Sequence, residues 1–166
     1  MPISDYLRAL RAKVGTDLLL MPSVTAAIRD QGGRLLMALH ADRRTWVLPG
    51  GCIDPGETPA DALVREVWEE TALHVEPVKL LGVFSGPEYR VHYANGDEAI
   101  YVMSVFSCRV LGGTPAPDGT ETLDVQYLSA EEIAGRPTPV WFGALLPMLL
   151  GREERGFTPP SWRPPR

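Results

Sequence analysis

The chain has 166 residues, 45% of them hydrophobic and 22% charged, which is enough to bury the core of one domain without disulfides or metal ions. The formal net charge of −5 argues against salt-driven binding to bulk nucleic acid, because such binding needs a basic surface. A small phosphate-bearing ligand is compatible with this charge if a metal ion supplies the positive charge. We expect a single domain over residues 1–150 and a proline-rich, extended tail over residues 151–166.

The two cysteines, Cys52 and Cys108, form no CxxC motif and no disulfide framework, which favours reduced thiols in a cytoplasmic protein. Residues 1–15 lack the apolar segment of a signal peptide. The apolar run at residues 18–28 is too short to cross a bilayer and predicts a buried strand. We therefore expect a cytoplasmic protein that does not bind membranes.

The predicted elements begin with a helix over residues 4–13, starting at Ser4 or Asp5. Two strands, over residues 17–29 and 34–40, are expected to form a hairpin around the turn DQGG. A loop then carries the segment TWVLPGG.

The second half of the chain has a strong hairpin signal, because β-forming residues alternate on both sides of Asn95-Gly96. The two strands of this hairpin are predicted over residues 88–93 and 98–110. The remaining elements are strands over residues 74–86 and 122–129 and helices over residues 58–73, 129–135 and 140–151. Strands dominate around one clear central helix, which predicts an α+β or mixed α/β fold.

Residues 58–73 carry the start signals of this central helix. Thr58 suits the N-cap, Pro59 the first helical position, and Asp61 the first turn, where the helix dipole favours negative charge. Spacing the residues ~100° apart around the axis gives one face with Ala60, Leu63, Val64, Val67, Trp68 and Thr71, and another with Asp61, Arg65, Glu66, Glu69 and Glu70. We expect the first face to pack on the core and the glutamates to point away from it.

The glutamates indicate either a solvated helix face or a metal site. A run of charge on a helix is usually solvated. However, Glu66 and Glu70 repel each other at i,i+4 with no lysine between them, and the Gly50-Gly51 loop lets backbone groups approach a ligand closely. Clustered carboxylates beside exposed carbonyls suit Mg²⁺ or Mn²⁺, which take oxygen ligands.

Residues 51–73 resemble the Nudix box, whose pattern is G-x5-E-x7-R-E-U-x-E-E-x-G-U with U an aliphatic residue. Every defined position matches except Ala72, which stands where the family has glycine. So many fixed positions make the signal specific. The resemblance implies an α/β/α sandwich with a mixed central β-sheet. It also implies only a small effect of Ala72, since a left-handed residue at a helix end costs alanine ~1 kcal/mol and the position supplies no ligand side chain.

The resemblance implies a Mg²⁺-dependent hydrolase, with Mn²⁺ as a possible substitute, that cuts the pyrophosphate of a nucleoside diphosphate linked to a group X. Position by position, the metal ligands would be Glu66, Glu69, Glu70 and the Gly50 carbonyl. Glu57 and Gly51 would support the site, and Arg65 would orient the glutamates rather than touch the substrate. The general base would be Glu69, or a loop carboxylate such as Glu121 or Glu98.

Other residues are candidates for substrate contacts. Arg43 and Arg44 precede the loop and suit a phosphate. Tyr89, Tyr93 and Trp46 could stack on a base, although aromatic residues in strands more often belong to the core.

Several alternatives stay open at the level of sequence. ADP-ribose and dinucleoside polyphosphates both fit as nucleotide-type partners, because the segment SGPEYRVHY contains the proline typical of one subfamily and the tyrosine typical of the other. Nucleoside triphosphates, including oxidised ones, stay open as well. A Nudix-fold module that binds a nucleotide without turnover is the main rival. The second is an isomerase or a glycosylase on the same fold, and the third is a calcium-binding or interaction domain with an acidic helix. A homodimer is possible.

Overall fold

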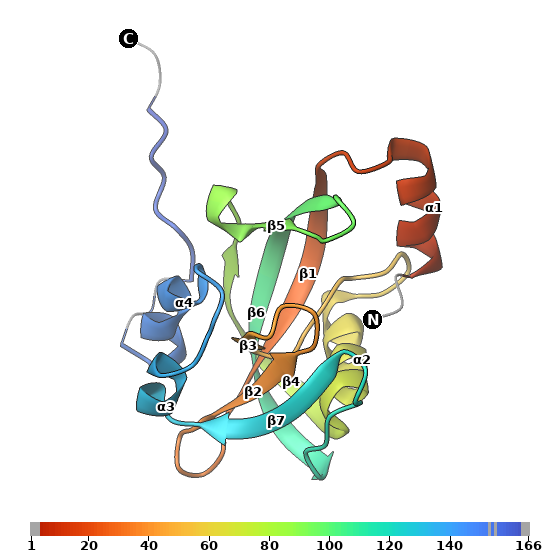
Figure 1. The fold of residues 1–166 in the computed structure, drawn as a ribbon. Helices are drawn as coiled ribbons and strands as arrows, with labels where there is room; N and C mark the ends of the chain where they lie inside the picture. The colour runs from red at the N-terminus through yellow and green to blue at the C-terminus, as the bar shows by residue number, and fades with distance from the viewer. Residues whose placement is uncertain (1–3, 153, 155, 164–166) are drawn as a thin grey trace.

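Two β-sheets lie between helices in the computed structural model, which describes residues 4–152, 154 and 156–163 (Figure 1). The larger sheet has the strand order β1-β6-β4, and β5 pairs with the first residues of β6. Its strands are β1 (Leu19–Ile28), β4 (Leu73–Phe84), β5 (Arg90–His92) and β6 (Glu98–Gly113). The sheet is mixed, because β1 runs parallel to β6 whereas β4 and β5 run antiparallel to it.

The smaller sheet is antiparallel and has the order β3-β2-β7. Its strands are β2 (Leu35–His40), β3 (Trp46–Val47) and β7 (Thr122–Leu128). The short strand β3 falls in a segment that the sequence predicted as a loop.

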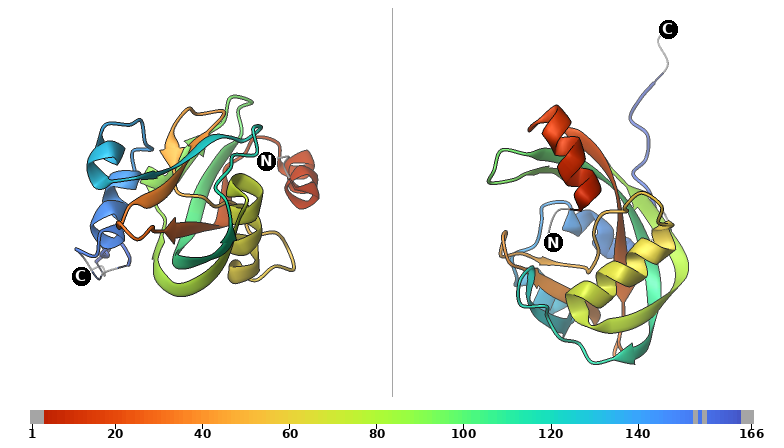
Figure 2. Two further views of the ribbon diagram at one scale, coloured as in Figure 1. Left: turned by 90° about the horizontal axis from the view of Figure 1, so that it is seen from below. Right: turned by 90° about the vertical axis from the view of Figure 1, so that its right-hand side faces the viewer.

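Helices cover the sheets on both sides, which confirms the expected α/β/α sandwich (Figure 1, Figure 2). On one side α2 (Pro59–Thr71) packs on β4 and β1. The core beneath it contains Val24, Ala26, Ile28, Leu36, Ala62, Leu63, Val67, Leu73, Val75 and Cys108. On the other side α3 (Ala130–Ala134) and α4 (Phe142–Leu149) bury Ile133, Phe142, Leu145, Met148 and Leu149 against residues of both sheets.

Two small elements lie at the periphery of the sandwich. Helix α1 (Asp5–Val14) contributes no fully buried side chain, and the oxygen of Ser4 accepts from the Leu7 amide as an N-cap. A single 3-10 turn, η1 (Pro87–Tyr89), precedes β5. The predicted N-terminal helix and the predicted hairpin around Asn95-Gly96 are both present.

The predicted hairpin between residues 17–29 and 34–40 is wrong. The turn itself forms, with the Gly33 amide donating to the Asp30 carbonyl at 3.0 Å. Beyond one isolated bridge, however, β1 and β2 belong to different sheets. Every residue of β1 from Ser23 to Ile28 is buried. Burial on both faces is typical of a strand in parallel pairing, which here is provided by β6.

The tail contacts the edge of the larger sheet at one point. The Gly156 carbonyl accepts a hydrogen bond from the Val83 amide at 2.7 Å. A Cβ atom on Gly82 would lie 2.3 Å from that carbonyl oxygen, so the two backbones meet where neither residue has a side chain. Within the described part of the chain, no helix is long and apolar enough to cross a membrane.

Candidate active site

Helix α2 begins and ends as its sequence predicts. The Thr58 hydroxyl accepts from the Asp61 amide at 3.2 Å, and Pro59 occupies the first turn. The helix ends at Ala72, which adopts the left-handed conformation with φ 56°. The departure from the family pattern therefore falls on a position whose backbone favours glycine.

The predicted assignment of the two helix faces is partly wrong. Glu66 and Glu70 are buried, with exposed fractions of 0% and 8%. Trp68, expected in the core, is 56% exposed, and Ala60 is exposed as well. The loop before the helix folds back over Glu66 and Glu70, whereas Asp61 and Glu69 on the same face stay exposed.

Two glycines make this close approach possible. A Cβ atom on Gly51 would lie 2.5 Å from the carboxylate of Glu66. A Cβ atom on Gly50, whose φ is 149°, would lie 2.2 Å from the Val24 carbonyl oxygen. The Gly50 amide donates to Glu70 Oε2 at 2.9 Å. The Gly51 carbonyl accepts from the Val24 amide, whereas no described residue donates to the Gly50 carbonyl.

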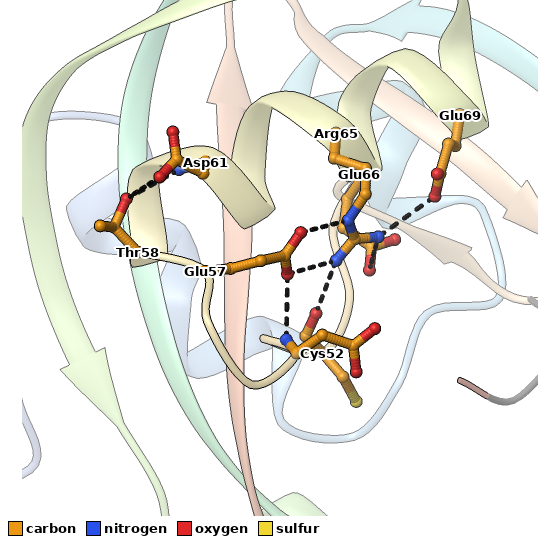
Figure 3. Close-up of polar contacts among 8 residues, drawn as sticks. Cys52, Glu57, Thr58, Asp61, Arg65, Glu66 and Glu69 are labelled. Carbon is orange, nitrogen blue, oxygen red and sulfur yellow. Dashed lines mark hydrogen bonds and ion pairs between the residues drawn. The ribbon is translucent and has the colours of Figure 1, made fainter. Parts of the chain in front are cut away.

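Arg65 holds the carboxylates of the site in place (Figure 3). It forms a two-pronged ion pair with Glu57, Nε to Oε1 at 2.6 Å and Nη2 to Oε2 at 2.8 Å. Its Nη1 donates to Glu66 Oε1 at 2.9 Å and to Glu69 Oε2 at 3.2 Å, and its Nη2 also donates to the Cys52 carbonyl. These contacts match the five N–H groups of a guanidinium, so Arg65 has no donor left for a substrate.

The Glu57–Arg65 pair is ionised at neutral pH. Hydrogen bonds from Arg65 lower the pKa of Glu57 to about 2, and the Asp54 amide, 3.0 Å from Glu57 Oε2, adds to this shift. The same pair raises the pKa of Arg65. Both oxygens of Glu57 accept hydrogen bonds, so Glu57 supports the site by holding Arg65 and the loop at Asp54.

Glu66 and Glu70 carry the opposite shift. Burial raises the pKa of Glu66 to about 7, although Arg65 opposes the rise. Burial also raises the pKa of Glu70 to about 8, although the Gly50 amide opposes it. Buried carboxylates that repel each other bind protons, or a cation in their place.

The oxygen atoms of the site fit a hard divalent cation. Glu66 Oε2 is buried and has no hydrogen-bond partner among the described residues, and buried polar atoms of this kind are rare. Carboxylate and carbonyl oxygens are the ligands that Mg²⁺ and Mn²⁺ prefer. In the described ranges, no three acidic, histidine or cysteine side chains lie close enough together to form a complete metal site. Glu66 and Glu69 are instead hydrogen-bonded to Arg65.

Two adjoining cavities meet at these carboxylates. The first, here called the acidic cavity, has a volume of 460 Å³ and is lined by Ser4, Asp54, Arg65, Glu66, Glu69, Glu70, Asp118, Thr120 and Glu121. The second, here called the main cavity, has a volume of 550 Å³, within the range of small-molecule sites. Both are lined by Ser4, Asp54, Glu70 and Glu121, so a ligand can reach from one into the other.

Aromatic side chains line the main cavity. They are Tyr89, Tyr93, Tyr101 and Trp141. Tyr89 and Trp141 stack with their ring centroids 5.7 Å apart, and the hydroxyls of Tyr93 and Tyr101 are hydrogen-bonded. Trp46 lies instead in the core, where Arg136 covers its ring at 4.5 Å.

Of the two loop carboxylates considered as general bases, the structure places only one in the walls of the cavities. Glu121 lines both cavities. Glu98 pairs with Arg90 and His92 and is absent from the described lining of either cavity. Arg43 lines the main cavity, whereas Arg44 does not contribute to the part of its wall that the structure describes.

Several residues of the cavity walls were not singled out from the sequence, among them Asp118, Tyr101, Trp141 and Arg11. Asp118 reaches the acidic cavity from the loop before β7, where its carboxylate accepts from the Thr122 amide at 2.8 Å. Tyr101, Trp141 and Arg11 reach the main cavity from β6, from the residue before α4 and from α1. No local pattern marks these four residues, because only the fold brings their segments to the box.

Comparison with known proteins identifies the family to which the chain is similar. Residues 19–146 match the family model of the NUDIX domain. A MutT-like protein of Streptomyces ambofaciens is 36% identical over 129 residues, which cover 78% of this chain and 77% of that protein. A putative 8-oxo-dGTP diphosphatase of Bacillus subtilis (strain 168) is 31% identical over 102 residues, 61% of this chain and 62% of that protein.

A solved structure supports the same assignment at the level of the fold. The crystal structure of an ADP-ribose pyrophosphatase from Streptococcus suis 89-1591 superposes with a TM-score of 0.64 at 24% identity, covering 83% of this chain and 98% of that chain. The family match spans most of the chain and includes the whole motif from Gly51 to Leu73. The chain therefore belongs to the NUDIX domain family, the Nudix pyrophosphohydrolases, which act on phosphoric anhydride bonds.

Proposed function

We propose that this chain is a Mg²⁺-dependent hydrolase that cleaves the pyrophosphate of a nucleoside diphosphate linked to a further group. The observation that carries the proposal is the buried Oε2 of Glu66, which has no hydrogen-bond partner among the described residues. Glu66 lines the acidic cavity, which adjoins the main cavity with its aromatic walls. Such an oxygen suits a cation, and the adjoining cavity suits a nucleoside.

Glu66, Glu69, Glu70 and the Gly50 carbonyl would hold the metal, with Mn²⁺ as an alternative to Mg²⁺. When bound, a divalent ion neutralises charge on the pyrophosphate and lowers the pKa of a water molecule. Glu66 and Glu70 must lose their protons to act as ligands, and Arg65 fixes the direction of the Glu66 carboxylate. Glu69 is half exposed, so it can turn from Arg65 towards a ligand.

The reaction needs a water molecule and a base. Water oxygen attacks one phosphorus, the bridging P–O bond breaks, and the bridging oxygen leaves with the other phosphate. We assign the proton of the attacking water to the Glu121 carboxylate, because Glu121 borders both cavities. Glu69 is the alternative base within the box.

The substrate proposal follows the cavities and the relatives. The 8-oxo-dGTP diphosphatase and the ADP-ribose pyrophosphatase named above both act on nucleotide pyrophosphates, as their names state. The aromatic lining of the main cavity supports a nucleobase there. We therefore favour nucleoside triphosphates, oxidised or normal, and ADP-ribose as substrate types.

The test is a substrate panel with Mg²⁺ and with Mn²⁺, measuring release of phosphate, pyrophosphate or nucleoside monophosphate. The panel contains ADP-ribose, dinucleoside polyphosphates, and normal and oxidised triphosphates, with Glu70→Gln as the matched variant. We expect turnover by the native chain that Glu70→Gln loses while it stays folded. Thermal stabilisation by one compound without any turnover would instead support a nucleotide-binding module.

A further inference from the structure

Two tyrosine hydroxyls meet in the wall of the main cavity. Tyr93 directly follows β5 and Tyr101 lies in β6, and their hydroxyls are hydrogen-bonded to each other. Ala99 shares the face of β6 that carries Tyr101 and is only 2% exposed. Because the side chain of Ala99 is small, the two rings can lean towards each other above it and bring their hydroxyls together.

On one side, this hydroxyl pair contacts the loop that begins the Nudix box. Burial raises the pKa of the Cys52 thiol to about 11, although a hydrogen bond with Tyr101 opposes the rise. Cys52 directly follows Gly51, and its carbonyl accepts from Arg65 Nη2 at 3.1 Å. Tyr101 therefore lies next to the loop whose Gly50 carbonyl is a proposed metal ligand.

On its other side, Tyr101 borders the aromatic wall of the main cavity. Arg90 of β5 pairs with Ile100 of β6 in antiparallel register, so Tyr89, one residue earlier, lies beside Tyr101 on the same face. Tyr89 is 2% exposed and stacks on Trp141. Trp141 is only partly buried and lines the cavity, so it is the ring of this stack that a nucleobase can reach.

The order of groups in a nucleotide then places its sugar at the hydroxyl pair. With the phosphates at the metal site and the base on Trp141, the sugar lies between Cys52 and Tyr89, where Tyr101 is. Each tyrosine hydroxyl can both donate and accept, so the bond between them leaves capacity for a ligand. The hydroxyls of a ribose also donate and accept. Burial raises the pKa of Tyr101, so its hydroxyl stays protonated at neutral pH.

We propose that the Tyr93–Tyr101 hydroxyl pair binds the neighbouring 2′ and 3′ hydroxyls of the substrate sugar and makes the chain selective for ribonucleotides over 2′-deoxyribonucleotides. This inference rests on the proposed function, which supplies the positions of the phosphates and the base. A 2′-deoxy sugar offers one hydroxyl fewer and forgoes about one neutral hydrogen bond. Such a bond corresponds to a difference in affinity of about threefold to tenfold.

The test compares Tyr93→Phe and Tyr101→Phe with the control Tyr6→Phe. Each change removes one hydroxyl and keeps the ring. Tyr6 is 51% exposed on α1 and is absent from the described lining of both cavities. The substrates are adenosine and guanosine triphosphate and their 2′-deoxy forms, for which kcat and KM are measured with Mg²⁺. Calorimetry with Mg²⁺ gives Kd for guanosine monophosphate and its 2′-deoxy form, which have no anhydride bond to cleave.

We expect the native chain and Tyr6→Phe to prefer the ribonucleotide by about threefold to tenfold in kcat/KM, with either base, and to bind the ribose monophosphate more tightly by a similar factor. Tyr93→Phe and Tyr101→Phe should each lose most of this preference. The loss should come from a higher KM for the ribonucleotide, with little change in kcat or in the values for the deoxyribonucleotide.

Three outcomes would overturn the inference. The first is a native chain that shows no preference between the two sugars in kcat/KM and in Kd. The second is a full preference that survives in both phenylalanine variants. The third is an equal loss on both sugars, which would indicate that the pair only holds the hairpin in place. If the chain cleaved no nucleotide of the panel, the proposed function would fail, and the two Kd values would still decide whether the pair recognises ribose.

Discussion

Arg65 and Glu57 face each other with both prongs of the guanidinium on both oxygens of the carboxylate, at 2.6 and 2.8 Å. The pair joins the loop before α2 to the middle of the helix (Figure 3). Because the same guanidinium also contacts Glu66, Glu69 and the Cys52 carbonyl, one side chain orients three carboxylates of the site and the loop beside them.

Replacing Arg65 by lysine tests whether the guanidinium orients the carboxylates of the site. Arg65→Lys keeps the charge but cannot bridge Glu57, Glu66 and Glu69 at once, since a lysine presents a point charge instead of a planar fork. We expect kcat to fall by about 10–100-fold, as for other partners that orient metal ligands. Steady-state kinetics with saturating Mg²⁺ measures this loss. Arg34→Lys, whose arginine pairs with Asp30 on the surface, is the control and should leave turnover unchanged.

The stability of the metal-free protein should fall as the pH rises from about 5 to about 8. Glu66 and Glu70 have pKa values of about 7 and about 8 in the folded chain, above the ordinary glutamate value of 4.5. The folded state therefore binds more protons than the unfolded state in this window, and the free energy of unfolding decreases with pH. Urea unfolding at several pH values, in the presence of a chelator, measures the slope.

Two comparisons check that these carboxylates cause the slope. Glu70→Gln should flatten this slope, because an amide has no proton to lose. Added Mg²⁺ should restore stability most at the high end of the window, because it binds the deprotonated carboxylates. A slope of the same size in Glu70→Gln would contradict the raised pKa of Glu70.

A methyl group on Gly51 should disable the site while leaving the fold intact. Its Cβ would lie 2.5 Å from the Glu66 carboxylate, so Gly51→Ala must displace either the loop or that side chain. We expect turnover to fall by at least about tenfold and the Mg²⁺ concentration for half-maximal activity to rise. Gly112→Ala is the matched control, because nothing lies within 4 Å of its Cβ position. Native kinetics in Gly51→Ala would show that Glu66 needs no fixed position.

Ala72→Gly should stabilise the chain. Ala72 has φ 56°, in the region where glycine has no steric cost, so we expect a gain of about 0.5–1 kcal/mol with unchanged kcat. The same exchange at Ala60, an exposed residue in the first turn of α2, should instead destabilise by about 0.5–1 kcal/mol. Thermal or urea unfolding of the two variants distinguishes these opposite changes in stability. A lower free energy of unfolding in Ala72→Gly would contradict backbone strain at Ala72.

Local sequence determined the central helix and the chemistry of its side chains. Thr58, Pro59 and Asp61 specify where α2 starts, and the spacing of Arg65 and the glutamates follows from helical periodicity, which depends only on neighbouring residues. The motif from Gly51 to Leu73 also identified the family, because its fixed positions form one continuous stretch.

The tertiary structure decided what surrounds that helix. Glu66 and Glu70 are buried because the Gly50-Gly51 loop is held against β1, and helical periodicity alone cannot show which face a distant segment will cover. Strand β1 pairs with β6 rather than with its neighbour β2, and Glu121 and Arg11 come to the main cavity from segments far apart in the chain. These arrangements depend on contacts between residues far apart in the chain, which the packing of the whole sandwich selects and no local pattern records.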